Sequence, residues 1–454
     1  MSTDTRIGRA SSALAAASGR LGERLGWNRV YRSASYLRSA LWVAPIASVL
    51  LALLLIGLLR LLDRFVTWDL TGLGVAGAQT LFQTLITLTL SFVVFTFGSL
   101  LVAIQIASGQ LTPRIIATTL LRDRVIKYTV GLNMFTLLFA VSAFNRTVDV
   151  VPQLVTLVAA LLGIACVTSF LFLIDYTARL LRPVRLVALV CDQGLDVVRS
   201  IYPEEEQEGV AAADAALVRG LGGPQRVALQ QGRSQIVLAV QVEPLLREAR
   251  RLDGVIELVP QVGDFVAADE PLFNLYGGAV RIDDALLRGS VAFGTERTME
   301  QDPTFAFRIL VDIALKALSP AINDPTTAVL AIDQVHRLLR LVGRRRLHDE
   351  GIRDAAGQVR LILRTPNWED FVHIACTEIR ACGAGSVQIP RRQRAMLENL
   401  VRTLPASRRA ALLEQLDLLD RTLPEYYKLP EDLALARIPD SQGIGGAAAG
   451  PPRA

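Results

Sequence analysis

Residues 80–110 read TLFQTLITLTLSFVVFTFGSLLVAIQIASGQ, an uncharged stretch long enough to cross a bilayer as a helix. Its polar and small residues recur at steps of three, four or seven, and on an α-helix they lie along one side. They are Thr80, Thr84, Thr87, Ser91, Gly98 and Gln105. Because polar groups within a membrane usually face protein or water rather than lipid, the stretch predicts a membrane protein in which this side has a function.

Three further apolar segments satisfy the same length criterion or approach it, at residues 41–59, 128–144 and 153–174. A hydrophobic fraction of 51% and a mean hydropathy of +0.38 suit a chain that is part membrane and part soluble. The first apolar run begins too far along the chain for a secretory signal. We therefore expect four transmembrane helices, which put both termini on the same side of the membrane.

The distribution of basic residues predicts which side that is. Arginines are concentrated before the first span, between the second and third spans, and after the fourth, whereas the opposite loops hold few. Lys and Arg near span ends are retained in the cytoplasm. We expect a multi-pass protein of the bacterial inner membrane with cytoplasmic N- and C-termini. Arg114, Arg122 and Arg124 then lie at the cytoplasmic end of the second and third spans.

The fold class that these patterns predict is an α+β membrane protein, in which four transmembrane helices precede a cytoplasmic region with a small barrel-sandwich-like β-rich domain and a C-terminal helical domain. We expect a basic cytoplasmic segment at residues 1–40, a four-helix transmembrane domain at 41–176, an amphipathic helix and linker at 177–223, the β-rich domain at 224–295, the helical domain at 296–425 and a largely disordered tail at 426–454.

Within the β-rich domain, residues 225–231 and 234–242 surround Gly232 and predict one hairpin. Residues 254–278 predict a second, with a turn at Gly263 and Asp264. The second hairpin resembles that of the biotinyl/lipoyl-type barrel-sandwich fold. However, Gly277 and Gly278 stand where the modified lysine would be, and no lysine lies between Lys127 and Lys316. We expect no attached cofactor and a role in packing or assembly.

The helical domain has two N-terminal signals of the same kind. Asp302-Pro303 and Asp324-Pro325 each supply a capping carboxylate followed by proline at the first helical position. They predict helices over residues 305–318 and 326–341, joined by a structural corner at Pro320, Asn323, Asp324 and Pro325. Further helices are expected over residues 368–382, 391–403 and 407–423.

The corner residues have a second interpretation, as a metal site. Asn323, Asp324, Asp312 and Asp333 carry oxygen atoms of the kind that bind a divalent cation. The structural interpretation is preferred, because Asp324 caps a helix and Asp333 is four residues before Arg337, at the spacing of a helical ion pair. We therefore expect no metal site here.

Four stretches together resemble a bacterial predicted-membrane-protein family, domain of unknown function 2254. They are TFGSLLVAIQIASGQLTPRII at residues 96–116, VGDFVAADEPL at 262–272, FGTERTMEQDPTFAFRILVDIALKALSPAINDPTTA at 293–328 and DFVHIACTEIR at 370–380. The resemblance implies an integral inner-membrane protein with a cytoplasmic domain. It implies no established activity and no catalytic residues.

The remaining sequence gives no support for an enzyme or a nucleic-acid-binding protein. The histidines lack HExxH spacing, and neither a GxSxG elbow nor a GxxxxGK[ST] loop occurs. A GxGxxG match at residues 72–77 lies between two predicted spans rather than after a strand. The soluble part has no basic stripe with interleaved aromatic residues. We expect no catalytic residues, no cofactor and no nucleic-acid partner, although distant residues could still assemble a site.

The polar side of residues 80–110 has two interpretations. Small and hydroxylated residues let neighbouring helices approach; alternatively, Thr80, Thr84, Thr87, Ser91 and Gln105 line a pathway on a symmetric axis, where hydroxyl and amide dipoles replace part of a solute's hydration. Arg114, Arg122 and Arg124 either form its cytoplasmic mouth or anchor the protein to lipid.

The preferred hypothesis is a homo-oligomeric channel or transport protein for an ion or small solute. The alternative is a membrane-anchored sensor or scaffold that binds a partner or small ligand.

Overall fold

The computed structural model describes residues 43–63, 71–110, 123–145, 147, 151–180, 182–205, 221–347 and 351–443. The chain divides into two compact units. One comprises Tyr36–Leu186, and the other comprises Val187–Ala454 together with Met1–Ser35. We refer to them as the membrane unit and the C-terminal unit and describe each by itself.

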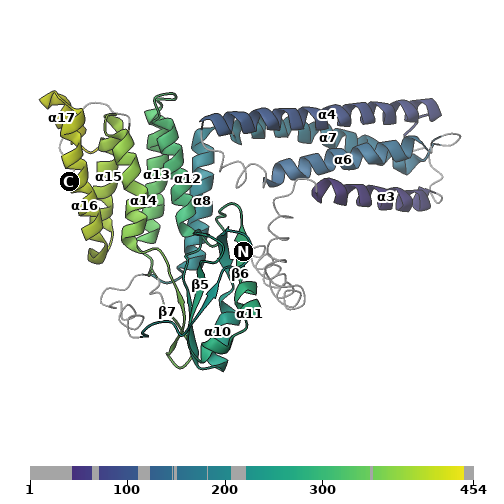
Figure 1. Ribbon diagram of the computed structural model, residues 1–454. Coiled ribbons are helices and arrows are strands. Elements are labelled where there is room, and N and C mark those ends of the chain that lie inside the picture. The colour runs from purple at the N-terminus through teal and green to yellow at the C-terminus, as the bar shows by residue number, and fades with distance from the viewer. Residues whose placement is uncertain are drawn as a thin grey trace. The chain divides into compact units, whose positions relative to one another are not determined.

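The membrane unit consists of helices that lie side by side (Figure 1), namely α3 (Val43–Asp63), α4 (Val75–Gln110), α6 (Arg124–Phe144) and α7 (Gln153–Leu180). Among the described residues, Val75–Ile106, Val125–Phe144 and Gln153–Arg179 are long and apolar enough to cross a membrane. A shorter apolar stretch, Ile46–Leu59, lies within α3. The second, third and fourth predicted spans are therefore confirmed as apolar helices of sufficient length, and the first is a helix with a shorter apolar stretch.

Helix α6 is the central helix of the membrane unit, because it packs against α3, α4 and α7. Half of its apolar stretch is buried within the unit, against 22% for the stretches of α4 and α7. It also carries buried polar side chains on Thr129, Asn133 and Thr136. These three polar side chains thus face the interior of the unit, as expected for a helix that crosses a membrane.

The described part of the C-terminal unit contains a five-stranded and a three-stranded sheet, of order β1-β5-β3-β8-β7 and β4-β2-β6. The strands are β1 (Arg226–Leu229), β2 (Gln235–Val240), β3 (Gly254–Leu258), β4 (Phe265–Val266), β5 (Pro271–Gly277), β6 (Val291–Gly294), β7 (Gly351–Arg353) and β8 (Val359–Leu363). Between them lie α10 (Val242–Arg251), η2 (Gly278–Arg281) and α11 (Asp284–Gly289). Ile256, Phe273, Leu275 and Leu361 belong to the buried core of this region.

One of the two predicted hairpins forms and the other does not. β3 pairs antiparallel with β5 around the Gly263 turn, as predicted. The hairpin over residues 225–242 is wrong, because β1 pairs with β5 whereas β2 pairs with β4 and β6. β2 lies between two partners and so leaves no free edge for β1. The backbone of Gln230 is instead bonded to Glu270 and Asp269, at the start of β5.

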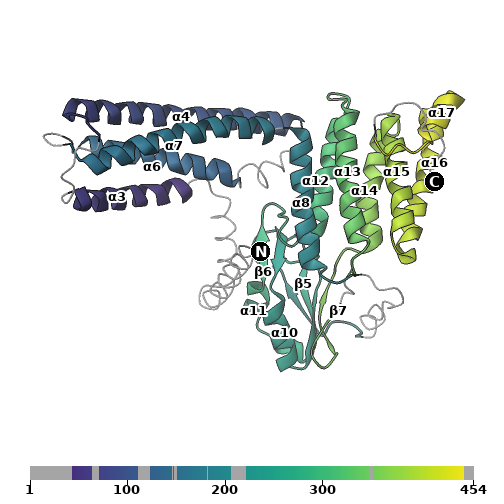
Figure 2. The ribbon, with the colours of Figure 1, turned by 180° about the vertical axis from the view of Figure 1, so that it is seen from behind.

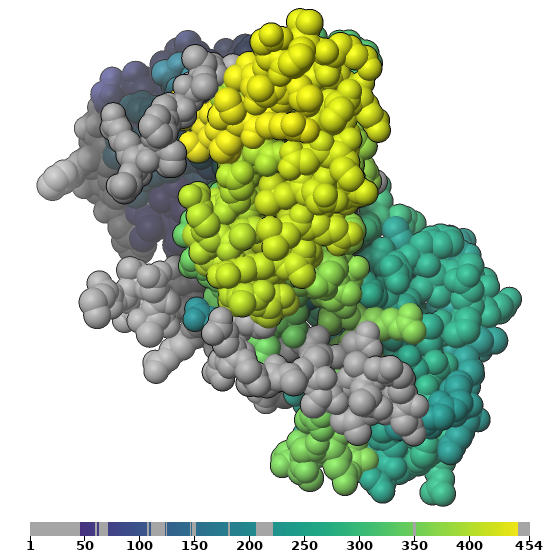
Figure 3. Space-filling model, turned by 90° about the vertical axis from the view of Figure 1, so that its left-hand side faces the viewer, coloured from purple at the N-terminus to yellow at the C-terminus, as the bar shows by residue number. Residues whose placement is uncertain are grey.

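The helices of the C-terminal unit lie in a row in both ribbon views (Figures 1 and 2), and the last of them form its yellow-green surface in Figure 3. They are α8 (Pro183–Ile201), α12 (Pro303–Ala317), α13 (Pro325–Val342), α14 (Trp368–Gly383), α15 (Gln388–Thr403), η3 (Ala406–Arg408), α16 (Arg409–Tyr426) and α17 (Pro430–Ala436). The predicted helices after residue 300 are confirmed. β7 and β8, in the segment predicted to be helical, extend the sheet instead, with β8 parallel to β3.

The two predicted caps are confirmed. Asp302 accepts hydrogen bonds from the backbone N–H groups of Thr304 and Phe305, and Asp324 accepts one from Thr327. Between these helices Asn323 adopts a left-handed φ of 48°, which asparagine tolerates better than most residues.

The predicted pair of Asp333 with Arg337 is wrong. Asp333 pairs with Arg392 on α15, and Arg337 pairs with Asp192 on α8. Long side chains on α13 thus reach neighbouring helices rather than the next turn of their own helix. The segment predicted as a disordered tail begins with α17, and the backbone of Asp440 donates a hydrogen bond to the carbonyl of Arg391.

A polar cluster joins α13 to α15 inside the helical row. Arg392 donates to Asp333 at 2.6 Å and lies 3.2 Å from Nδ1 of His336, whose Nε2 lies 3.0 Å from Oδ1 of Asn399. The arrangement requires an imidazole that accepts at Nδ1 and donates at Nε2, which is the neutral form. Burial, followed by the charges of Arg392 and Arg340, lowers the pKa of His336, while Asn399 and Asp333 oppose the shift.

This lowered pKa predicts acid sensitivity of the C-terminal unit. The unfolded chain, with a histidine pKa of about 6.5, binds a proton before the folded one does, so the contribution of His336 to stability is present above that pH and is lost as the pH falls toward the folded-state value. His336→Gln should therefore reduce the drop in thermal-unfolding midpoint between about pH 7.5 and pH 5.5, measured by differential scanning fluorimetry on the full chain. An unchanged pH dependence would show that His336 does not titrate on unfolding.

Candidate functional site

The polar stripe of α4, defined as Thr80, Thr84, Thr87, Ser91, Gly98 and Gln105, lies on the exposed surface of the membrane unit. At 3.6 residues per turn, these positions fall within about 40° of one line along the helix. The buried residues of α4 fall within about 40° of the opposite line. They are Ala78, Phe82, Leu85, Thr89, Thr96, Leu100 and Ala103. The stripe therefore points directly away from the other described helices of its own unit, and it does not serve packing within that unit.

The hydroxyl groups of the stripe bond to their own helix. Thr80, Thr84, Thr87 and Ser91 each donate to the carbonyl four residues earlier, at 2.8–3.0 Å. Each hydroxyl oxygen still has the capacity to accept a hydrogen bond. A row of acceptors therefore remains available to a neighbour, to water or to a solute.

Sequence reasoning missed one residue on the same side. Gln83 is exposed and lies about 60° from the centre of the stripe. Neither its amide nor that of Gln105 makes a hydrogen bond to another residue within the described ranges. The two residues lie about 33 Å apart along the helix axis, close to the thickness of the hydrocarbon core, about 30 Å. Gln83 lies three residues after Thr80 and Thr84 lies four, so both fit a helical spacing. The predicted stripe includes only Thr84.

The other predicted positions around this site are only partly described. Arg114 and Arg122 lie outside the described residues, and Arg124 is the first residue of α6, with its side chain outside them. Asp123, beside Arg124, caps α6 and accepts a hydrogen bond from the hydroxyl of Tyr176 at 2.5 Å. The predicted arginine mouth therefore stays a prediction.

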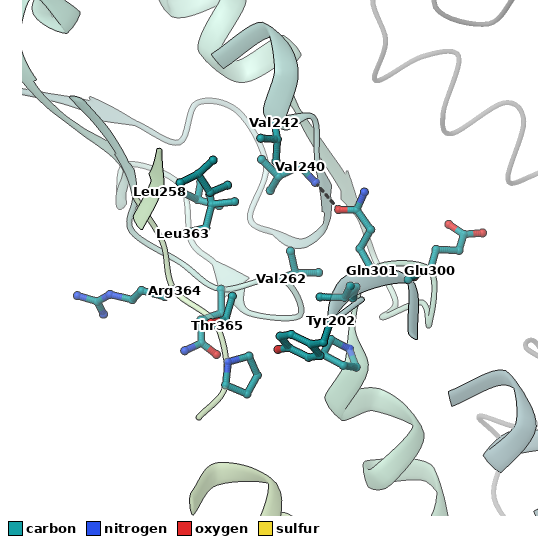
Figure 4. Close-up of a pocket in the computed structure, with 16 residues that line it drawn as sticks. Tyr202, Val240, Val242, Leu258, Val262, Glu300, Gln301, Leu363, Arg364 and Thr365 are labelled. Atoms are coloured by element: carbon teal, nitrogen blue, oxygen red, sulfur yellow. Dashed lines mark hydrogen bonds between the residues drawn. The ribbon is translucent and has the colours of Figure 1, made fainter. Parts of the chain in front are cut away.

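A second candidate site is a cavity of about 420 Å³ in the C-terminal unit, which sequence reasoning did not predict. Its interior is apolar, with Val240, Val242, Leu258, Val262 and Leu363 around the space and Tyr202 at one side (Figure 4). Tyr202 is fully buried, and its ring meets that of Phe371 edge-on. The volume and the apolar lining match those of small-molecule sites.

One wall of the cavity is held by an ion pair. Arg297 donates from Nε to Asp302 at 2.8 Å, and the same carboxylate accepts from the hydroxyl of Thr304 at 2.7 Å and caps α12. The guanidinium of Arg297 also lies 5.3 Å from the ring centroid of Phe305. Asp302 is only 2% exposed, so its charge depends on these partners. The backbone between Arg297 and Pro303 is fixed as a result.

The Gly263 turn packs directly against this ion pair. Gly263 has a φ of 99°, and a Cβ there would lie 2.5 Å from Oδ2 of Asp302 and 2.6 Å from Nη2 of Arg297. Next along the wall, Oε1 of Gln301 accepts a hydrogen bond from the backbone of Val240 at 2.9 Å, visible in Figure 4. Turn, ion pair and strand thus form one rigid wall. Two stretches that carry the family resemblance, residues 262–272 and 293–328, meet here.

The polar side chains of the lining differ in whether they have partners. Gln301 accepts a hydrogen bond from the backbone of Val240, and Glu300 has another interaction. Arg364 is exposed at the edge of the cavity, with its side chain directed away from the apolar interior (Figure 4). It makes no ion pair or hydrogen bond to any residue that the structure describes. The lining therefore holds one cation, Arg364, without a partner in the described part of the chain, and one anion, Glu300, that has another interaction.

The remaining predicted positions lie at the corner between α12 and α13 and at Gly278. Pro320 and Asn323 are exposed in the αα-corner. No group of three or more His, Cys, Asp and Glu side chains that could hold a metal ion occurs among the described residues. A Cβ at Gly278 would lie 1.6 Å from the carbonyl oxygen of Leu252, so the position where a barrel-sandwich carrier would have its lysine has no room for a side chain.

Comparison with known proteins gives a family but no activity. A family described as "Predicted membrane protein (DUF2254)" matches residues 38–399. Uncharacterized proteins of Mycobacterium bovis and Mycobacterium tuberculosis are 27% identical over 444 residues, covering 90% of this chain and 81% of the relative. No solved structure matches the chain.

The contact of Gly263 with the ion pair can be tested against a matched glycine. Gly232 has a similar φ of 94° but open space around it. Alanine at either position should cost about 1–2 kcal/mol for left-handed backbone, and Gly263→Ala should cost about 2 kcal/mol more because it displaces a buried ion pair. Thermal unfolding of the full chain measures the difference. Equal losses in the two variants would show that the wall tolerates a methyl group.

Proposed function

Because the chain belongs to the DUF2254 family of predicted membrane proteins, we propose that it is a homo-oligomeric protein of the bacterial inner membrane in which the polar stripe of α4 lines a shared pathway for an ion or small solute. The observation that carries this proposal is the position of the stripe, opposite the face by which α4 packs into its own unit.

The first argument is the contrast between helices of one bundle. α6 buries Thr129, Asn133 and Thr136, whereas the hydroxyl-bearing side of α4 is exposed. Lipid-facing surfaces have no use for the polar line from Thr80 to Ser91, which toward Gln105 is interrupted by exposed apolar residues such as Val94 and Val102. A surface of sister subunits or water accounts for a stripe that lipid alone does not.

The second argument is that, in the described part of one subunit, no open space lies along α4 between its neighbouring helices. Side chains fill the space between α4, α6 and α7, among them Phe82 and Phe139, both fully buried. The rings of Phe92 and Phe170 also stack there, with their centroids 4.0 Å apart. A ring of identical subunits closes by symmetry and forms an axis without opening the bundle. The hydroxyls of Thr84, Thr87 and Ser91 would then line this axis, with Gln83 and Gln105 toward its two ends.

Four crossings with cytoplasmic termini complete this proposal. α3 has 21 residues, about 32 Å at the helical rise, enough to cross a hydrocarbon core of about 30 Å. The bias of arginines toward the termini and the connection between α4 and α6 favours the cytoplasmic side for these segments. Arg114, Arg122 and Arg124 would stand at the cytoplasmic end of the stripe or anchor it to anionic lipid.

The alternative function is that of a membrane-anchored sensor or scaffold, and the cavity of the C-terminal unit is the observation in its favour. Its rigid wall and apolar lining suit a small ligand. In this case the two small sheets, as a barrel-sandwich-like module, would serve packing and ligand binding, and the membrane helices would only anchor the chain.

Oligomerisation is required by the pathway hypothesis. Native mass spectrometry of the full chain in a mild detergent should give a mass of several subunits. The double variant Thr84→Leu and Ser91→Leu should still form oligomers, because the apolar flanks of α4 continue to pack. A strict monomer for the wild-type protein at all detergent and protein concentrations would contradict the hypothesis.

Solute flux separates a pathway from simple anchoring. Replacement of Thr84 and Ser91 by leucine removes two acceptors worth about 1 kcal/mol each, so flux through liposomes should fall by roughly tenfold or more. Ion-selective dyes and osmolyte-induced swelling measure it. Thr168→Leu is the matched control, because Thr168 is exposed on α7 and bonds its own helix in the same way. Equal flux in the double variant and the control would exclude the stripe as a lining.

A further inference from the structure

We propose that the cavity of the C-terminal unit binds a small amphiphilic anion, a medium-chain carboxylate such as octanoate, with Arg364 as the residue that takes the charged group. This inference deepens the ligand-binding alternative and does not depend on the pathway in α4. Neither the family description nor the relatives assign a ligand.

The apolar body is inferred from the interior of the cavity. Val240, Leu258 and Tyr202 are buried, and Val262 and Leu363 are half-buried around about 420 Å³ of space. Sugars, nucleotides and other highly polar molecules would lose their hydration here without recovering it, because the interior presents few groups that are not already bonded. An alkyl or branched apolar group gains free energy from leaving water.

The negative head group is inferred from the rim. Arg364 and Glu300 are the charged residues of the lining, and Glu300 is already engaged. Arg364 has no partner within the described chain, in contrast to the nearby Arg360, which pairs with Asp253 and Asp354. A guanidinium matches the geometry of a carboxylate, with which it forms two parallel hydrogen bonds. Arg364 is exposed, and the proposal requires its guanidinium to turn toward the mouth from the outward direction seen in Figure 4.

The cavity is also built to stay open. A defect in packing would collapse around its own side chains, but here the wall is held by the Arg297–Asp302 ion pair, the Gly263 turn and the bond from Val240 to Gln301. A preformed site loses less free energy to ordering when it binds a ligand.

The experiment uses the full chain in phosphatidylcholine nanodiscs, with empty nanodiscs as the blank, and isothermal titration calorimetry as the readout. Four probes are compared: hexanoate, octanoate, 1-octanol and octylammonium. We expect octanoate to bind roughly fifteenfold more tightly than hexanoate, since it has two more methylenes and each buried methylene contributes about fourfold. Octanol should bind more weakly than octanoate, and octylammonium should not bind above the blank.

Two variants assign the residues. Arg364→Gln should abolish the preference for octanoate over octanol, while the alkyl group of each probe still binds in the cavity. Arg233→Gln is its control, because Arg233 is another exposed arginine of this unit outside the lining, and its guanidinium has no partner among the described residues. Val262→Phe should fill the space and abolish binding of both probes. If Val262→Phe fails to fold, the arginine pair still decides the question.

Three outcomes would overturn the proposal. They are the absence of octanoate binding, equal binding of octanoate and octylammonium, and a preference for octanoate that survives Arg364→Gln. The flux assay on α4 is independent of all three, so a failure of this proposal and a failure of the pathway hypothesis remain distinguishable.

Discussion

Lipid offers no hydrogen bonds, and this constraint governs how the polar residues of the membrane unit are arranged. α6 satisfies it by turning Thr129, Asn133 and Thr136 into the bundle. α4 buries Thr89 and Thr96 in the same way but leaves a second polar side exposed, where the hydroxyls bond to their own backbone. Backbone bonding lowers the cost of exposing a hydroxyl to lipid but does not explain why the hydroxyls share one line. A partner surface does explain it, which is why the proposal for the whole protein begins at α4.

In the C-terminal unit a comparable role falls to the carboxylate of Asp302. It caps α12, pairs with Arg297 and leaves room beside it only for a glycine. A buried charge must be paired or its desolvation is not offset, so the residues on either side of Asp302 are held in one conformation. The cavity wall follows from that requirement. The same residues that begin α12 therefore also shape the apolar cavity beside the sheets.

The sequence predicts those features that depend on interactions between residues close together in the chain. Asp302-Pro303 and Asp324-Pro325 specify where α12 and α13 begin, because a cap and a fixed φ act within one turn. The side on which the α4 residues gather likewise follows from helical spacing alone. Long-range choices were not accessible in this way. β1 and β2 were assigned to one hairpin although they belong to different sheets, β8 was missed because it joins β3 from about a hundred residues away, and Asp333 takes a partner from α15 rather than from its own helix. The cavity could not be predicted from the sequence for the same reason, since its lining comes from separate segments of the chain.

The chemistry of the two sites implies different kinds of selection. The stripe of α4 contains no charged residue, and hydroxyl and amide dipoles can turn either end toward a solute. A pathway lined by it alone would select by size and hydration, and selection by charge would have to come from its ends. The cavity, in contrast, combines an apolar interior with Arg364 at its edge, and as proposed it would distinguish anionic from cationic amphiphiles. If both sites are used, the specificity of the protein for charge lies in the C-terminal unit rather than in the membrane, and a charge placed on the stripe would alter selection more than any change at its hydroxyls.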